Sequence, residues 1–274
     1  MDGLTLPFAP ERVSRRSFLP FSLHAVFPFL ALIVTAAGAW GLGWLPRSGL
    51  SAVGLGAFHG ALVALAFASV SLKRGGALTL YTGGLILAAA LTPVSPWGGL
   101  IYLLAPGALF FFVPRLPEIR RLGLCWPKER QSLWLGMAAG VFLGGHLLIS
   151  ATQTLGYQPR LFPLGAFLSA VAYDWGANVL SAECFFRGAL FGPWQRRWGF
   201  WAAAFAATGV SLVRYLLDPA LPRTVEILAG SIFYLALLNL SGCALYRRSG
   251  SLAPSALASL IFFAAYRSLG GGEG

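Results

Sequence analysis

The chain has 274 residues, of which 57% are hydrophobic and only 11% are charged, and its formal net charge is +11. A soluble domain typically carries about 25% charged residues. This chain therefore has too little polar surface to cover a water-exposed globule, which excludes a soluble domain and predicts an all-α, polytopic integral membrane protein. Three widely separated cysteines, Cys125, Cys184 and Cys243, match no zinc spacing and argue against a disulfide framework. No metal and no cofactor are predicted.

Nine apolar segments approach the length of about 20 residues that a helix needs to cross a bilayer. In chain order they cover about residues 25–45, 51–72, 76–94, 98–114, 133–152, 164–192, 199–217, 226–246 and 251–268. We expect N-terminal transmembrane helices over 1–114, a basic cytoplasmic linker over 115–132, and a transmembrane core over 133–268. The first segment is too long for the apolar region of a signal peptide, so we expect it to be retained as a helix.

The basic residues fall in alternate loops between these segments. If the N-terminus is cytoplasmic, the cytoplasmic loops hold Arg12, Arg15, Arg16, Lys73, Arg74, Arg115, Arg120, Arg121, Lys128, Arg130, Arg196, Arg197, Arg247 and Arg248. The outer segments hold only Arg47, Arg160, Arg223 and Arg267. The positive-inside rule then predicts an N-in, C-out topology. Most of the positive charge is explained by topology, so no nucleic-acid partner is predicted, and a bacterial inner membrane is the expected location.

A few ionisable residues lie at membrane depth, where a charge costs about 2.5 kcal/mol or more and needs a partner or a wet cavity. They are Asp174, Glu183, Arg187 and Arg214, together with His59 and His146. The two histidines have no local ligand spacing, and we interpret each as a hydrogen-bond partner between helices.

Glu183 and Arg187 are spaced i, i+4 and therefore share one face of a helix. They form either a self-neutralising structural pair or a carboxylate that its own guanidinium keeps ionised and oriented toward a water or a substrate. Asp174 starts a second polar stripe with Asn178 and Ser181. Because Asp174 precedes Glu183 by nine residues, we expect the two acids on roughly opposite helix faces, with a structural interhelical bond at Asp174.

Two further residues are candidates for this site. Arg214 lies on the next helix, at a depth between the two acids, and is expected to reach either of them. It is either a charge-balancing residue or a stabiliser of an anion. Cys184 follows Glu183 directly and is either an inert apolar residue or a thiol nucleophile beside the arginines.

The stretch SAECFFRGAL at 181–190, followed by RRWG at 196–199, resembles the CPBP family of membrane proteins. This is the CAAX prenyl protease and bacteriocin-processing type, also called glutamic intramembrane proteases. The first motif of that family is E-E-x-x-x-R, usually continued as F-R-G-x-L, and a later G-S-L-x-P-like segment is similar to GSLAP at 250–254. The resemblance covers roughly residues 130–268.

The chain departs from this family at its catalytic positions. Arg187 fixes the register, so Ala182 stands at the first glutamate and Glu183 at the second. Arg214 stands at the histidine of the second motif, F-x-x-x-H, while Ser259 and Phe263 stand at the histidine and asparagine of the third, H-x-x-x-N. In the family, the first glutamate and the second-motif histidine are thought to activate a water, and the last pair to stabilise the oxyanion. The resemblance thus implies a divergent member with a degenerate catalytic set.

Two functions stay open from the sequence. The first is an intramembrane endopeptidase relative that cuts or sorts membrane-anchored proteins at their termini, with Glu183, Arg187, Arg214 and Cys184 as its candidate site residues. The second is a noncatalytic pseudoprotease that binds membrane proteins as a scaffold or assembly factor. A transporter is disfavoured, because no inverted repeat is visible and the polar residues concentrate on one helix. The expected partners are a membrane-anchored protein or peptide and the lipid bilayer.

The alternating basic loops give a direct prediction of topology. Single cysteines introduced near Arg196 should react with a membrane-impermeant maleimide only after the cytoplasmic face is exposed. Labelling of those positions from the outer face of intact cells would contradict the N-in topology.

Overall fold

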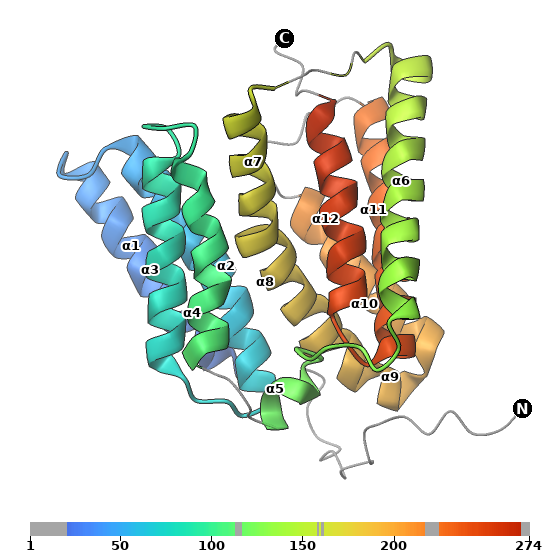
Figure 1. Cartoon of the computed structure of the whole chain (residues 1–274). Helices are drawn as coiled ribbons and strands as arrows, with labels where there is room; N and C mark the ends of the chain where they lie inside the picture. The colour runs from blue at the N-terminus through green and yellow to red at the C-terminus, as the bar shows by residue number, and fades with distance from the viewer. Residues whose placement is uncertain (1–20, 113–116, 158, 160–161, 217–224, 270–274) are drawn as a thin grey trace, which may run out of the picture.

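The computed structural model describes residues 21–112, 117–157, 159, 162–216 and 225–269, and every regular element in these ranges is a helix (Figure 1). The elements are η1 (Leu23–Val26), α1 (Phe27–Gly41), α2 (Arg47–Ser69), α3 (Gly75–Leu91), η2 (Gly98–Leu103), α4 (Leu104–Phe112), α5 (Pro117–Arg121), α6 (Gln131–Leu155), α7 (Leu164–Tyr173), η3 (Asp174–Val179), α8 (Leu180–Ala182), η4 (Glu183–Phe191), α9 (Gly192–Trp198), α10 (Phe200–Leu216), α11 (Val225–Ser249) and α12 (Ala253–Ser268). The predicted all-helical fold class is confirmed for the described residues.

Four helical segments in the described part of the chain are long and apolar enough to cross a membrane. They are Leu23–Gly41, Arg47–Ser69, Gln131–Thr154 and Leu228–Ser249. Each of the other expected segments has a helical counterpart that is shorter or divided into several elements. The full set of nine spans and the N-in orientation therefore stay predictions. Arg12, Arg15, Arg16, Arg115, Arg160 and Arg223, on which part of the topology argument depends, lie outside the described residues.

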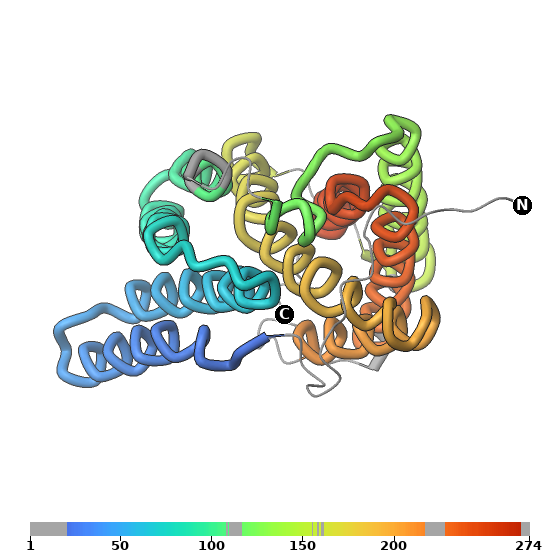
Figure 2. The backbone as a smooth tube through the Cα atoms, turned by 90° about the horizontal axis from the view of Figure 1, so that it is seen from below, coloured from blue at the N-terminus to red at the C-terminus, as the bar shows by residue number. Residues whose placement is uncertain are grey.

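One helical path, from α7 through η3, α8 and η4 to α9, runs through the middle of the molecule (Figure 2). The helices α1 to α4 lie on one side of it, and α6, α11 and α12 lie on the other. On the first side, α2 packs against α8 and η4; on the second side, α12 packs against η3 and α7. The central path is thus covered on both sides, which explains why almost all of its side chains from Gly176 to Gly192 are buried.

The closest packing on the C-terminal side is between α6 and α12, and glycines on α6 allow it. Gly136, Gly140 and Gly144 recur every fourth residue and so lie on one helix face. A Cβ atom at Gly140 would lie 2.8 Å from the carbonyl oxygen of Ala258, and one at Gly136 would overlap the carbonyl of Pro254. Small residues at such a spacing let two helix backbones approach closely in a membrane.

Two parts of the central path, η3 and η4, are π-helical. In a π-helix the N–H bonds to the carbonyl five residues back, as the N–H of Gly192 does to Arg187. Each turn therefore takes more residues than an α-turn, and side chains along η3 are rotated relative to an ideal α-helix. As a result Asp174 and Glu183 both face α12, where they bind Arg267 and the Ser255–Ser259 pair. The expectation that the two acids lie on opposite faces was wrong, because it assumed a uniform α-helix.

Replacing Gly136 by alanine tests the α6–α12 contact. A Cβ there must displace the α12 backbone, so we expect a loss of about 1–3 kcal/mol in the free energy of unfolding, typical of overpacking. Gly145 on the same helix faces open space, since no heavy atom would lie within 4 Å of a Cβ added there. Gly145→Ala is therefore the control, and it should be neutral or stabilising by about 0.5–1 kcal/mol. Thermal unfolding in detergent compares them, and equal midpoints for the two variants would contradict the assigned contact.

Candidate functional site

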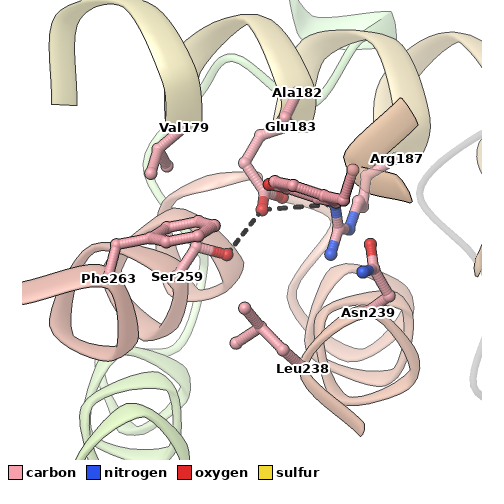
Figure 3. A pocket seen from close by; sticks show the side chains of 9 residues that line it. Val179, Ala182, Glu183, Arg187, Leu238, Asn239, Ser259 and Phe263 are labelled. Carbon is pink, nitrogen blue, oxygen red and sulfur yellow. Dashed lines mark hydrogen bonds and ion pairs between the residues drawn. The ribbon is translucent and has the colours of Figure 1, made fainter. Parts of the chain in front are cut away.

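The carboxylate of Glu183 is the centre of a polar site enclosed by the central path, α11 and α12. The residue is 2% exposed. The hydroxyl of Ser255 donates to its Oε2 atom at 2.6 Å, and the hydroxyl of Ser259 donates to Oε1 at 2.9 Å. Nη1 of Arg187 lies 3.5 Å from Oε1, one helical turn along η4 (Figure 3). The predicted Glu183–Arg187 pair is therefore present, and two serines of α12 complete the surroundings of the acid.

Arg187 is buried between η4 and α11. A glycine of α11 makes room for its guanidinium, since a Cβ at Gly242 would lie 2.8 Å from Nη2. The Nε atom of Arg187 is buried without a hydrogen-bond partner in the described residues. The side chain of Asn239 lies beside the guanidinium (Figure 3), and its Nδ2 donates to the carbonyl of Leu235 at 2.7 Å. This leaves donor groups of Arg187 and Asn239 near the carboxylate.

A small cavity adjoins this cluster. Its walls are formed by Val179, Ala182, Glu183, Arg187, Tyr215, Leu238, Asn239, Ser259 and Phe263. The volume within which the centre of a water molecule can lie is about 10 Å³. This is close to the minimum that a cavity needs to hold one water. Three of the positions at which the family pattern has catalytic groups, Ala182, Ser259 and Phe263, line it. The chain therefore brings these positions together around Glu183, with alanine, serine and phenylalanine in place of the family residues.

A second polar network lies farther along the central path and contains Asp174 and Arg214. Arg267 of α12 donates from Nε and Nη2 to the two carboxylate oxygens of Asp174, at 2.6 and 2.9 Å. Asn178 donates to Asp174 at 3.2 Å and accepts from Nη2 of Arg214 at 2.7 Å. Arg214 is thus linked to Asp174 through Asn178. The sequence predicted that Arg214 reaches one of the acids. In the structure its hydrogen bond goes to the amide oxygen of Asn178, which in turn donates to Asp174.

The two intramembrane histidines join helices, as predicted. His59 of α2 is buried and shares hydrogen bonds with Ser181 at 2.7 Å and with the hydroxyl of Tyr173 at 3.1 Å. His146 of α6 shares a hydrogen bond of 2.7 Å with the hydroxyl of Tyr234 on α11. The histidines thus lie in separate clusters, on opposite sides of the central path.

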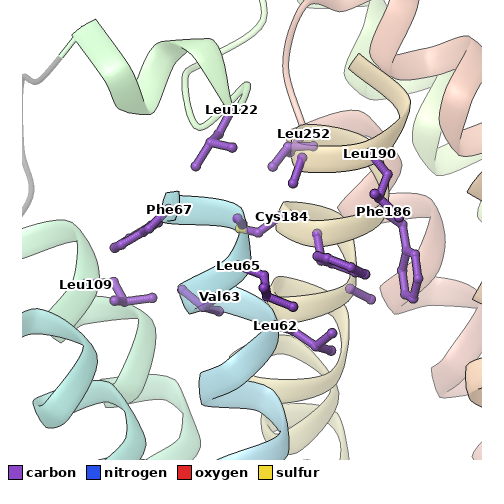
Figure 4. Close-up of a cluster of buried hydrophobic side chains, with 14 of the residues drawn as sticks. Leu62, Val63, Leu65, Phe67, Leu109, Leu122, Cys184, Phe186, Leu190 and Leu252 are labelled. Carbon is purple, nitrogen blue, oxygen red and sulfur yellow. The ribbon is translucent and has the colours of Figure 1, made fainter. Parts of the chain in front are cut away.

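Cys184 points away from the Glu183 cavity. It is 1% exposed and belongs to an apolar cluster between η4 and α2 that includes Leu65 and Leu122 (Figure 4). The structure therefore separates Cys184 from the other candidate residues: Glu183 and Arg187 face α11 and α12, whereas the thiol faces α2.

Sequence reasoning missed Asn239 and Ser255, and it named Ser259 only as the residue at the histidine of the third family motif. Asn239 was detectable, because a lone asparagine in an otherwise apolar spanning segment needs a hydrogen-bond partner in lipid. Ser255 and Ser259 were weaker signals, since serine is common in membrane helices as a small packing residue. Their role depends on which face of α12 meets the central path.

Thiol labelling tests the placement of Cys184. In the native protein, maleimide should modify Cys125 in the linker and leave Cys184 unmodified until the protein is denatured. Burial raises the pKa of the Cys125 thiol, an effect that Arg120 and Lys128 partly oppose, so its labelling should accelerate as the pH rises and thiolate forms. Mass spectrometry of the modified peptides measures which cysteine is labelled and how fast Cys125 reacts at each pH.

A Cys184→Ala variant should fold and function normally, with a change of about 1 kcal/mol or less in the free energy of unfolding. The contrary result is native labelling of Cys184 that inhibits function, together with an inactive Cys184→Ser variant. That pair of findings would assign the thiol as a nucleophile.

Comparison with known proteins covers the segment that holds the Glu183 site. Residues 163–264 match the family described as type II CAAX prenyl endopeptidase Rce1-like. No curated protein and no solved structure matches the chain. The matched segment begins just before α7 and ends within α12, so it contains Glu183, Arg187, Asn239 and both serines of the site. The resemblance seen in the SAECFFRGAL motif is thereby confirmed: residues 163–264 are similar to the Rce1-like CAAX endopeptidases of the CPBP family.

Proposed function

We propose that this protein is a CAAX-type intramembrane endopeptidase with a rebuilt site, which cuts or sorts membrane-anchored proteins at their termini in a bacterial inner membrane. The observation that carries the proposal is a buried, paired carboxylate, Glu183, beside a cavity just large enough for one water. The family match to residues 163–264 supports the reaction class. The division into N-terminal helices over 1–114, a linker over 115–132 and a core over 133–268 is part of the same proposal.

In this proposal Glu183 activates the water. A carboxylate has about four lone-pair positions, and Ser255, Ser259 and Arg187 engage three of them. The remaining position can accept a proton from a water in the cavity. The oxygen of that water then attacks the carbonyl carbon of the scissile peptide bond. The proton then passes to the leaving amine. A positioned general base of this kind contributes about 10²–10⁴ to the rate.

The negative charge that develops on the carbonyl oxygen needs donors. Arg187 and Asn239 are the groups at the cavity that can supply them, because both side chains keep N–H groups outside the hydrogen bonds they already make. An oxyanion donor is worth about 10²–10³ in rate. Arg214 is always protonated and bonded to Asn178, so it is proposed to position the central path and takes no part as a base. Cys184, in its apolar cluster, takes no part in the reaction.

A second candidate function, a noncatalytic scaffold for membrane proteins, is favoured by one specific feature of the cavity. The side chain of Phe263 and the methyl group of Ala182 occupy the wall where family members have polar catalytic groups, and only one water fits. Under this alternative, Glu183 joins η4 to α12 through Ser255 and Ser259 and has a structural role. The partner would then bind without being cut.

Charge removal at Glu183 distinguishes the two functions. Membrane fractions are compared, by sequencing of protein termini, between a strain that lacks the protein and strains complemented with each variant. If the protein is a peptidase, new termini of membrane proteins appear with the wild type and fall by at least about 100-fold with Glu183→Gln. Asp174→Asn is the matched control, since it also replaces a buried, arginine-paired acid by its amide, and it should keep most of the processing.

Expression and detergent stability of both variants are measured alongside, because a buried arginine without its partner can destabilise the fold. Normal processing by a well-expressed Glu183→Gln variant removes the catalytic role. Unchanged termini in every strain, combined with loss of a co-purifying membrane protein in Glu183→Gln, would establish the scaffold.

A further inference from the structure

A second, larger cavity lies away from the Glu183 site, between the N-terminal helices and the central path. Its volume is about 470 Å³, within the range of pockets that enclose a small molecule. It is lined by Ser48, Ser51, Ala52, Leu55, Ala89, Thr92, Pro93, Pro96, Tyr102, Ala166, Ser169, Ala170, Tyr173 and Arg267. We call it the α2–α7 cleft. Arg267 and Ser259 are eight residues apart on α12, which separates the cleft from the Glu183 cavity by about 12 Å along the helix.

The residues of the cleft are arranged by depth. The mouth is formed by the first turn of α2, the segment after α3 and the first turn of α7, at the end of the molecule where α7 begins (Figure 1). The walls are mainly apolar, with Ala52, Leu55, Ala89 and Ala170. Tyr173 lies about 14 Å below the start of α7, at a rise of about 1.5 Å per residue. The polar groups Tyr173 and Arg267 therefore form the floor of the cleft. The apolar part above them, lined by Ala52, Leu55, Ala89 and Ala170, is called the shaft.

The polar network behind the floor carries an excess of positive charge, although Arg267 is its only charged residue that lines the cleft. The network of Arg267, Asp174, Asn178 and Arg214 contains two arginines and one carboxylate. Asp174 is itself 1% exposed and accepts from Nε and Nη2 of Arg267, which leaves the Nη1 group of that guanidinium for another acceptor. Nη1 of Arg214 is buried without a hydrogen-bond partner in the described residues. An arginine network with one positive charge in excess and a guanidinium nitrogen left for another acceptor favours the binding of an anion.

Arg267 is also held in place for such a ligand. Besides the two hydrogen bonds to Asp174, its guanidinium carbon lies 5.5 Å from the centre of the Tyr173 ring. Its side chain is 35% exposed, whereas Asp174 behind it is buried. A fixed guanidinium loses little conformational entropy when a carboxylate binds, and a charge-assisted hydrogen bond of this type is stronger than a neutral one.

The residues that line the cleft indicate which chemical class of ligand fits between the helices. An extended peptide would bring one N–H and one C=O per residue, and each would need a partner. The parts of α2, α3 and α7 that line the cleft have their backbone groups paired within each helix, and two of the lining hydroxyls are engaged: Thr92 donates to Ala88, and Ser169 donates to Pro96. An alkyl chain has no polar groups and needs no hydrogen-bond partners. We propose that the α2–α7 cleft binds a single-chain amphiphile with a carboxylate head, such as a fatty acid, with its head on Arg267 and its chain between α2, α3 and α7.

The test uses the full-length protein in detergent and a photoreactive palmitic acid that carries a diazirine in its chain. The same chain ending in an alcohol is the uncharged probe. The acid should label peptides of α2 and α7 saturably, and at least about tenfold more than the alcohol at equal concentration, because only the acid makes a charge-assisted bond. Equal labelling by acid and alcohol overturns the proposal.

Two variants assign the labelling to the cleft. Ala170→Phe fills the apolar part of the cleft and leaves every residue of the arginine network unsubstituted, and it should reduce labelling by at least about fivefold, since the space for the chain is lost. Ala138→Phe adds the same bulk at an exposed position of α6, outside the cleft, and should label like the wild type. If Ala170→Phe does not fold, Ala166→Phe at the exposed mouth replaces it. Undiminished labelling in the folded shaft variant overturns the proposal.

The role of the arginine is tested by a double variant, Asp174→Asn with Arg267→Gln, which removes both charges together and so leaves neither one buried alone. Its labelling by the acid should fall to the level of the alcohol. A preference for the acid that survives in this variant overturns the assignment of Arg267.

Competition experiments distinguish a fatty acid from a phospholipid or a peptide as the natural source of the anionic group. Unlabelled palmitate should displace the probe, and a two-chain anionic phospholipid or a hydrophobic peptide with a free C-terminal carboxylate should displace it at least about tenfold more weakly, since neither fits the shaft as one apolar chain. Stronger displacement by the peptide or by the phospholipid overturns the single-chain ligand in favour of that competitor.

Discussion

The high free-energy cost of a charge inside a membrane is the constraint on which the arrangement of this protein depends. Two carboxylates, Asp174 and Glu183, lie on the central helical path, and α12 supplies partners to both. The partners follow one stripe of α12, at positions 255, 259 and 267, so a single helix face meets both acids. The close approach of α6 to α12 supports this face from behind, because the glycines of α6 let the two backbones come together. Charge neutralisation and backbone packing thus place the same helix.

The π-helical geometry of η3 and η4 lets one helix serve both acids. A regular α-helix would place residues nine positions apart on different faces, and one of the acids would then face α2 or lipid. The wider turns rotate Asp174 toward the face of Glu183, at the cost of less regular hydrogen bonding along the path. Such π segments occur often at functional sites. Here they lie under both polar networks, which connects the local backbone geometry to the chemistry of the site.

The Glu183 cavity and the α2–α7 cleft differ in what they can accept. The first is enclosed by the core helices and is just large enough for one water, and its carboxylate is paired with Arg187 and hydrogen-bonded by two serines. The second is far larger, and the arginine on its floor belongs to a network with positive charge in excess. One site is therefore suited to a small neutral reactant, and the other to an anion with an apolar body. Both sites include residues of α12: Ser259 and Phe263 at the first, and Arg267 at the second.

The sequence alone determined the helical fold class and the apolar, membrane-protein character of the chain, and it singled out Asp174, Glu183, Arg187 and Arg214, which the structure places in two polar networks. These follow from composition and from local apolar runs, which act at the level of single segments. The motif around Glu183 and Arg187 was also local, since both residues lie on one helical turn. The Rce1-like resemblance followed from this turn and its neighbours, and the family match confirmed it.

The tertiary structure decided the partners of those charges. Ser255 and Ser259 are 72 and 76 residues from Glu183, and Arg267 is 93 residues from Asp174. No periodicity indicates such pairs, because each depends on which face of α12 is turned inward. The π-helical rotation of Asp174 and the placement of Cys184 against α2 were hidden for the same reason: the face that a residue presents depends on the backbone of its whole helix and on the helices packed against it, while the sequence pattern reports only the average helical period.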